Sequence, residues 1–165
     1  MNIVRHAKKR RRQLIGKMTR AERLVRAELD RMGMKYVPQK IVITAGNMCR
    51  LIDFYLPESH IALEIDDTRH TRASDLPREI EIAAVPTMDR IRFARIRNST
   101  VYRAKRRLGD VIRNALAFAY SVEWEGEAPK VVQYAPRITG ARHKVTGLTL
   151  PEPPKKLSGL LANLL

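Results

Sequence analysis

The sequence predicts an α+β fold in which helices flank a small mixed β-sheet, and three observations support this prediction. Residues 51–66 form two short strand-like runs around a turn. Residues 19–33 and 99–120 place apolar side chains at helical spacing, so we expect one helix over each range. Residues 90–97 alternate charged and apolar side chains, as a strand with one buried face does.

The 165 residues suit one domain with a sizeable hydrophobic core and a tail. We predict a basic N-terminal arm over residues 1–18, the domain over 19–121 and a proline-containing tail over 122–165. Five of the nine prolines lie in that tail, and no long helical or strand pattern continues into it. Its apolar end, residues 157–165, is expected to dock on the domain itself or on a protein partner.

Residues 51–66 are the stretch around which the domain is built. Residues 51–56 and 61–66 are rich in β-branched and aromatic side chains, and the four residues between them favour a turn, so we expect a β-hairpin. If Leu56 pairs with Ile61, antiparallel register places Asp53 opposite Glu64. Because side chains alternate along a strand, Asp66 then shares their face. The hairpin is therefore expected to gather three carboxylates on one patch.

Like charges that oppose one another at roughly 5 Å destabilise a hairpin unless something offsets their repulsion. A hard cation such as Mg²⁺ does so, since it takes oxygen ligands from one or two carboxylates, water and substrate phosphate. The alternative is a solvated acidic face of the sheet. We favour the metal site because the second strand is otherwise apolar and the chain as a whole is strongly basic.

The same residues carry a resemblance. Asp53-Phe54-Tyr55, Glu64-Ile65-Asp66 and His70 resemble the PD-(D/E)xK nuclease superfamily, and within it the small nuclease-like family related to very-short-patch repair endonucleases. Members of that family carry a DFxxP strand followed by an ExDGxxH strand. Here Asp67 stands at the glycine position, and Asp66 stands where the superfamily has its lysine.

The resemblance implies a restriction-endonuclease-like core and a metal-dependent DNA endonuclease, which hydrolyses phosphodiester bonds in DNA repair or recombination. It implies that Asp53, Glu64 and the backbone carbonyl of Ile65 hold Mg²⁺ or Mn²⁺, with Asp66 assisting. His70 would orient or deprotonate the attacking water. Two rival functions remain, a non-catalytic nucleic-acid-binding module and an accessory interaction protein that recruits a larger complex through its apolar tail.

Glu22 has two candidate roles. Thr19-Arg20-Ala21-Glu22 fits a capping box, in which Thr19 is the N-cap and Glu22 reaches back to its backbone N–H. In the related nucleases a glutamate of the first helix can lie near the metal, so Glu22 is also a catalytic candidate. Capping alone accounts for its position, and we favour that role.

The charge of the chain points to a polyanionic partner. There are 32 Lys and Arg against 17 Asp and Glu, a net charge of +15, and nucleic acid is the commonest partner of so basic a protein. No apolar run approaches the roughly 20 residues that span a bilayer, so we expect no membrane insertion. Cys49 is the only cysteine, which favours a reducing cytoplasm, and the Cys and His residues lack the paired spacing of a zinc site.

The basic residues concentrate in the first 35 residues and in residues 90–113. We expect the run at 5–12 to be an untied arm that grips phosphates, although a solvated arm or a localisation signal would have the same composition. A helix over residues 74–85 adds further cations beside the metal face. The expected nucleic-acid contacts are Arg10, Arg11, Arg12, Arg72, Arg78, Arg103, Arg106 and Arg107. DNA is thus the expected partner, and cutting both strands of a duplex would need a homodimer.

Overall fold

The computed structural model describes residues 3–67, 72–121, 124–125 and 128–129. All of them belong to the first of the two units of the chain, residues 1–135. His70, the side chain of Arg72 and nearly all of the expected tail, its apolar end included, lie outside the described residues.

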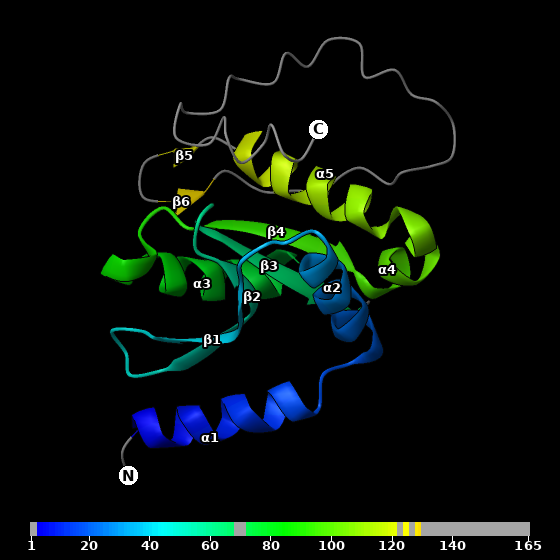
Figure 1. The fold of residues 1–165 in the computed structure, drawn as a ribbon. Coiled ribbons are helices and arrows are strands. Elements are labelled where there is room, and N and C mark those ends of the chain that lie inside the picture. Colours follow the sequence, from blue (N-terminus) through cyan, green and yellow to red (C-terminus); the bar gives the residue numbers. More distant parts are fainter. Residues whose placement is uncertain (1–2, 68–71, 122–123, 126–127, 130–165) are drawn as a thin grey trace. The chain divides into compact units, whose positions relative to one another are not determined.

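A four-stranded sheet in the order β1-β2-β3-β4 forms the centre of this unit (Figure 1). The strands are β1 (Val37–Ile43), β2 (Cys49–Leu56), β3 (Ile61–Asp66) and β4 (Arg92–Arg97). Neighbouring strands are antiparallel except β3 and β4, which are parallel. All six residues of β3 are buried, as expected of an interior strand covered on both faces. The predicted α+β class, with an antiparallel hairpin in a small mixed sheet, is confirmed.

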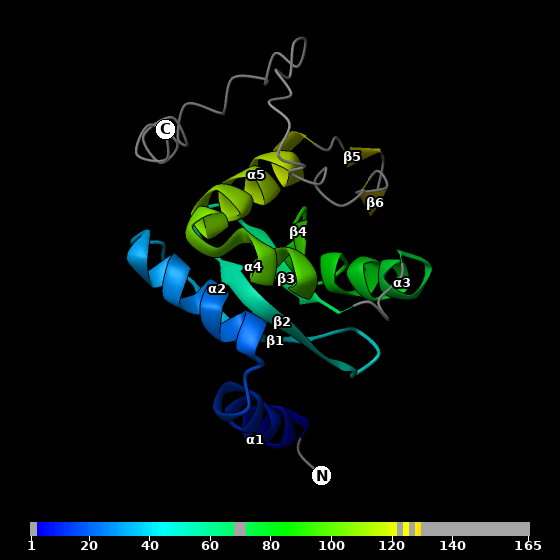
Figure 2. The same ribbon diagram turned by 90° about the vertical axis from the view of Figure 1, so that its right-hand side faces the viewer.

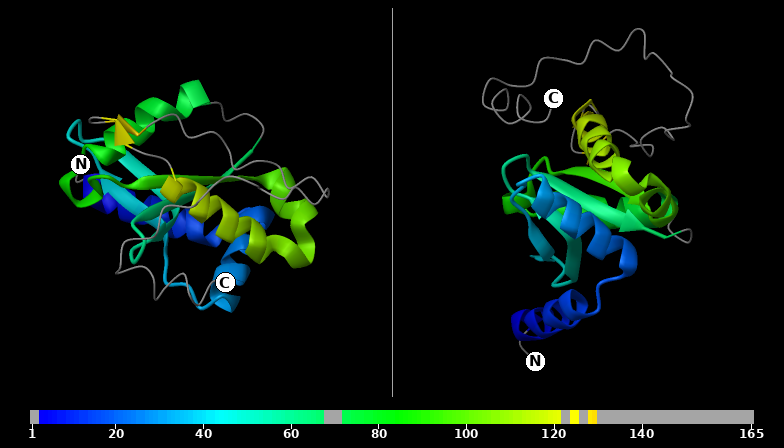
Figure 3. Two further views of the ribbon diagram at one scale, coloured as in Figure 1. Left: turned by 90° about the horizontal axis from the view of Figure 1, so that it is seen from above. Right: turned by 45° about the vertical axis from the view of Figure 1, so that its right-hand side comes forward.

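Helices cover both faces of the sheet. The helices are α1 (Ile3–Gly16), α2 (Arg20–Arg31), α3 (Arg72–Ala83), α4 (Asn98–Ala104) and α5 (Leu108–Ser121). Two short 3-10 helices are also present, η1 (Pro86–Met88) and η2 (Lys105–Arg107). A separate two-stranded sheet is formed by β5 (Trp124–Glu125) and β6 (Ala128–Pro129). One core joins α2, α4 and α5 to one face of the sheet, and a second core joins α3 to the other (Figures 2 and 3). None of the helices within the described ranges combines the length and the hydropathy needed to cross a bilayer.

The hairpin that organises the sequence forms as predicted, with Leu56 paired to Ile61. Its turn is fixed by His60, which has a left-handed φ of +54°. The ring Nε2 of His60 donates to the carbonyl oxygen of Asp89, 2.9 Å away, so its Nδ1 accepts from the hydroxyl of Tyr55 at 2.9 Å. The turn between β2 and β3 is thereby attached to the segment that leads into β4.

The alternation of faces along β2 is interrupted at Asp53. Ile52 belongs to the core under α3, whereas Phe54 belongs to the core under α2 and α5, although an uninterrupted strand keeps residues i and i+2 on one face. Opposite Asp53, Gln39 has a φ of +47°, and the regular pairs are Lys40 with Ile52 and Pro38 with Phe54. The β1–β2 ladder is therefore kinked at the pair Gln39–Asp53.

The N-terminal segment differs from the expected untied arm, because Ile3–Gly16 is the helix α1. Its inner face packs against β1, with Ala7 fully buried and Nε of Arg11 donating to the carbonyl oxygen of Pro38 at 3.2 Å. The apolar positions Ile3, Ala7 and Leu14 recur at helical spacing, and the run of cations between them concealed that pattern.

The continuous helix expected over residues 99–120 is also a wrong prediction. The segment divides into α4, η2 and α5 at Lys105, whose φ and ψ of +46° and −118° interrupt the helix. Local helical spacing continues on both sides of the break, so periodicity alone did not reveal it.

The contribution of the Thr19 capping box to the stability of the protein can be measured. Replacement of Thr19 by Ala removes the acceptor for the Glu22 backbone N–H, so we expect the free energy of unfolding to fall by about 1 kcal/mol in urea denaturation. Thr87→Ala, at an exposed position in η1, is the matched control and should change it by less than about 0.5 kcal/mol. Equal stabilities of the two variants would show that the cap contributes nothing.

Candidate active site

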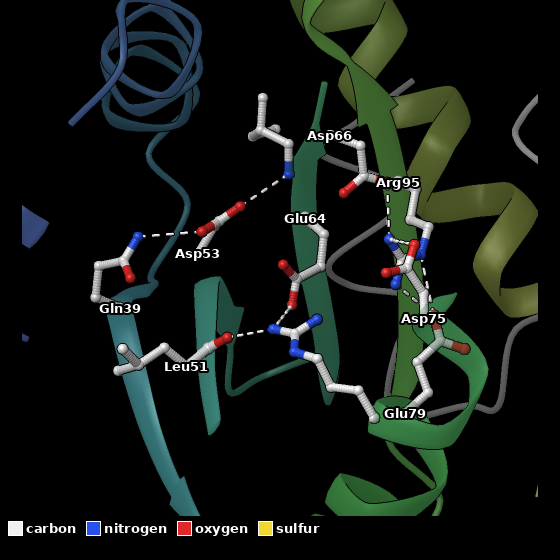
Figure 4. A network of polar contacts seen from close by, with 10 residues as sticks. Gln39, Leu51, Asp53, Glu64, Asp66, Asp75, Glu79 and Arg95 are labelled. Carbon is white, nitrogen blue, oxygen red and sulfur yellow. Dashed lines mark hydrogen bonds and ion pairs between the residues drawn. The ribbon is translucent and has the colours of Figure 1, made fainter. Parts of the chain in front are cut away.

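Asp53 is held by two hydrogen bonds where the sheet departs from regular pairing (Figure 4). Its Oδ2 accepts from the backbone N–H of Ile65 at 3.0 Å, and its Oδ1 accepts from Nε2 of Gln39 at 3.1 Å. The backbone pairing of β2 with β3 ends at Phe54–Leu63, so the carboxylate satisfies an N–H that the ladder leaves free. Burial raises the pKa of Asp53, and the two hydrogen bonds act against that rise.

Glu64 lies on β3 and is nearly inaccessible to solvent. Its Oε1 accepts from Nη2 of Arg78 at 2.9 Å, and the same nitrogen also donates to the carbonyl oxygen of Leu51. Burial and then the charge of Asp53 raise the pKa of Glu64 to about 8, while Arg78 and Arg95 act in the opposite direction. The two carboxylates of the predicted hairpin pair are thus close enough to repel one another.

Glu22 reaches the same region from the first turn of α2. Its Oε2 accepts from the backbone N–H of Thr19 and its own N–H donates to Oγ1 of Thr19, each at 3.2 Å, which completes the predicted capping box. Burial and then the charge of Asp53 raise the pKa of Glu22. Glu22 therefore closes the cap and also interacts electrostatically with Asp53.

Asp66 is directed elsewhere, to a buried network around Arg95 (Figure 4). Nη1 of Arg95 donates to Oδ2 of Asp66 at 2.7 Å and to Oδ2 of Asp75 at 3.0 Å, while Nε and Nη2 donate to Oε1 of Glu79 at 3.0 and 2.6 Å. These side chains are at most 8% exposed. The predicted patch of three carboxylates is therefore formed only in part. Arg95 of the parallel neighbour β4 binds Asp66, while burial and, after it, the charge of Asp66 still contribute to the raised pKa of Asp53.

The donor atoms around Asp53 and Glu64 fit a hard cation, although no three Asp, Glu, His or Cys side chains of the described residues are grouped closely enough to bind one metal. Two carboxylates and the nearby carbonyl of Ile65 are the oxygen donors that Mg²⁺ and Mn²⁺ prefer, with water completing the shell. A ligand must be deprotonated, so an ion here would compete with the proton on Glu64 and with Arg78.

The expected nucleic-acid residues fall into three groups. Arg10 and Arg12 are exposed on α1, whereas Arg11 faces inward. Arg103, Arg106 and Arg107 are exposed on α4 and η2. Arg78 lies beside Glu64, with a quarter of its side chain exposed.

Sequence reasoning missed Gln39 as the second support of Asp53, and it missed Arg95. Asp75 and Glu79 lie four residues apart, hence on one face of a helix, and that spacing was the available signal for a buried cation partner. Nothing local in the sequence indicated the left-handed backbone of Gln39.

Removal of Arg95 should strongly destabilise the protein at neutral pH. Arg95→Met leaves the carboxylates of Asp66 and Glu79 buried without this guanidinium, and breaking such a pair costs about 3–5 kcal/mol in urea denaturation. Arg113→Met breaks the partly exposed pair with Asp110 and should cost less than about 1 kcal/mol. A loss below 1 kcal/mol for Arg95→Met would contradict the network.

The raised pKa of Glu64 predicts how the stability of the protein changes with pH in the absence of divalent cations. The folded state holds a proton up to a pKa of about 8, whereas the unfolded chain releases it near 4.5, so the free energy of unfolding falls as the pH rises between these values. Glu64→Gln removes this titration and should flatten the curve measured by urea denaturation at pH 5, 6.5 and 8. The control Glu58→Gln, at an exposed turn position, should retain the wild-type slope, and equal slopes for wild type and Glu64→Gln would contradict the assignment.

Comparison of this chain with protein-family models, with curated proteins and with solved structures found no match.

Proposed function

We propose that this chain is a metal-dependent DNA endonuclease of the PD-(D/E)xK type, which hydrolyses phosphodiester bonds in DNA repair or recombination. The observation that carries the proposal is the approach of Glu22, Asp53 and Glu64 from α2, β2 and β3. Burial, and then the charge of Asp53, raises the pKa values of Glu22 and Glu64 inside a chain of net charge +15. Such like-charge clusters in a folded core are typical of sites that bind a cation or transfer a proton.

Asp53, Glu64 and the carbonyl of Ile65 would hold Mg²⁺ or Mn²⁺. A bound ion of this kind activates water and neutralises the charge that develops on the scissile phosphate. The chain itself supplies the positioning, because Gln39 and the Ile65 N–H fix both oxygens of Asp53 and Arg78 fixes Glu64. All of these groups lie on strands and helices, which hold a site more accurately than loops do.

Arg78 and His70 would act directly on the substrate. Arg78 contacts Glu64 and is a quarter exposed, so its remaining N–H groups can bind a phosphate oxygen of DNA. His70 follows β3 in the sequence and would orient or deprotonate the attacking water. Asp66 would support the site through its pair with Arg95 rather than as a direct ligand.

The outer face of α1 would hold the DNA backbone. Arg5, Lys9 and Arg12 are exposed and recur at helical spacing opposite the buried Ala7, so they form one basic stripe. The helix is anchored to Pro38, the neighbour of Gln39, by Arg11. The stripe is thereby fixed to the strand that supports Asp53. We place the enzyme in the cytoplasm, where the single Cys49 stays reduced, and double-strand cutting would use a homodimer.

A non-catalytic DNA-binding module is the second candidate. The ion pair of Arg78 with Glu64 satisfies this carboxylate without a metal, and Asp66 occupies the position of the superfamily lysine. Such a module would keep the basic surfaces and would lack phosphodiester hydrolysis.

Cleavage of supercoiled plasmid DNA in Mg²⁺ or Mn²⁺ tests the proposal. Wild type should nick or linearise the plasmid. Asp53→Asn should reduce the cleavage rate by at least about 100-fold, because it removes the charge of a metal ligand while keeping the size and shape of the side chain. Asp89→Asn, at an exposed position before β4, should cleave like wild type. If wild type binds DNA but neither ion supports cutting of plasmid, nicked or branched substrates, the binding-module function replaces the nuclease.

A further inference from the structure

The backbone of Lys105 has a conformation that glycine normally occupies. Its φ of +46° and ψ of −118° correspond to the second residue of a type II′ turn, where a Cβ atom is crowded. Such a conformation at a non-glycine residue costs roughly 1–3 kcal/mol and persists only where the surrounding structure imposes it. Asn47, which also has a positive φ, is by contrast a residue type that tolerates it.

The segments on both sides of Lys105 are fixed to the body of the protein. On α4, Val101 is buried and the ring of Tyr102 lies under the guanidinium of Arg20, 5.8 Å from its centroid. On α5, Leu108 is buried, and a Cβ atom at Gly109 would lie 2.5 Å from Oε1 of Glu28 on α2. The bend therefore joins two helices that are both packed against the core of the protein.

This bend presents consecutive cations to solvent. Lys105, Arg106 and Arg107 are all exposed, and Arg103 lies one helical turn before Arg106. Lys105, Arg106 and Arg107 make no ion pair with any residue in the part of the chain that the structure describes. The nearest acid in the sequence, Asp110, is paired with Arg113 at 2.5 Å. The positive charge at the bend is therefore not neutralised by any acidic side chain of the described residues.

The bend lies at the same end of the sheet as the carboxylates. Arg97, the last residue of β4, is in register with Asp66, the last residue of β3. The helix α4 begins at the next residue and spans seven residues, which is about 10 Å at 1.5 Å per residue. The bend therefore lies one short helix beyond the end of β4.

We propose that Lys105–Arg107 is a docking site for the phosphate backbone of duplex nucleic acid, and that the strained backbone of Lys105 aims its ammonium group at a phosphate. A role of this site in positioning DNA for cleavage rests on the proposed function, whereas binding at the bend does not. An anionic membrane surface is less suited, because the cations project from a tight turn rather than from the polar side of an apolar face.

Substitutions at Lys105 separate the role of the charge from the role of the strain. Lys105→Gly removes both, Lys105→Ala removes the charge and keeps the crowded Cβ, and Lys105→Arg keeps both. Arg90→Gly is the matched control, since Arg90 is also exposed and has a φ of +56°, but precedes the opposite end of β4.

Binding is measured by fluorescence anisotropy of a labelled 20-base-pair duplex, with the full chain in EDTA and salt varied from 50 to 300 mM. Lys105→Gly and Lys105→Ala should each weaken binding several-fold and reduce the slope of log K against log salt by about 0.9, the effect of one lost phosphate contact. Lys105→Arg and Arg90→Gly should bind like wild type. In thermal unfolding, Lys105→Gly should raise Tm by about 3 °C and Lys105→Ala should not.

The docking site is rejected if Lys105→Gly and Lys105→Ala bind duplex with the wild-type slope, or if they lose only binding to vesicles that contain phosphatidylserine. A lowered Tm for Lys105→Gly overturns the argument from strain. A wild type that never cuts DNA, together with weakened binding by both variants, retains the docking site and rejects the nuclease. If wild type cuts DNA and Lys105→Ala binds duplex as wild type does, the nuclease is retained and the docking site is rejected.

Discussion

The hydrogen bond from the Ile65 N–H to Asp53 is the interaction on which the candidate site depends. It replaces a backbone hydrogen bond at the point where the pairing of β2 with β3 ends. The Asp53 side chain therefore supplies the acceptor for the Ile65 N–H and is held beside Glu64. Gln39 completes the arrangement from β1, where its left-handed backbone kinks the opposing strand. Both oxygens of the buried Asp53 carboxylate thereby have hydrogen-bond donors.

Buried charge is organised around two guanidinium groups with different surroundings. Arg95 is enclosed and binds carboxylates of β3 and α3, which explains how α3 is fixed to its face of the sheet. Arg78 is partly exposed and touches Glu64 at the border of the same region. We infer that Arg95 has a structural role, whereas Arg78 has the access to solvent that contact with a substrate requires.

The sequence was sufficient for features that depend on neighbouring residues. Alternation and turn chemistry predicted the pairing of Leu56 with Ile61 and the approach of Asp53 to Glu64, and the capping box at Thr19 formed as written. Long-range contacts decided the rest. The parallel pairing of β3 with β4 brings Arg95 to Asp66, and packing imposes the positive φ of Lys105 that divides the last long helix. The apolar residues of α1 recur at helical spacing in the sequence, but the basic run between them led to the prediction of an untied arm.

A crystal structure of the full chain grown in Mn²⁺ would show whether Asp53 and Glu64 together bind one divalent cation. We expect an anomalous difference peak within about 2.5 Å of carboxylate oxygens of both residues, with the guanidinium of Arg78 displaced from Glu64. Asp53 should keep its hydrogen bond from Ile65. Absence of a peak at saturating Mn²⁺, with Arg78 still bound to Glu64, would show that the two carboxylates do not form a metal site.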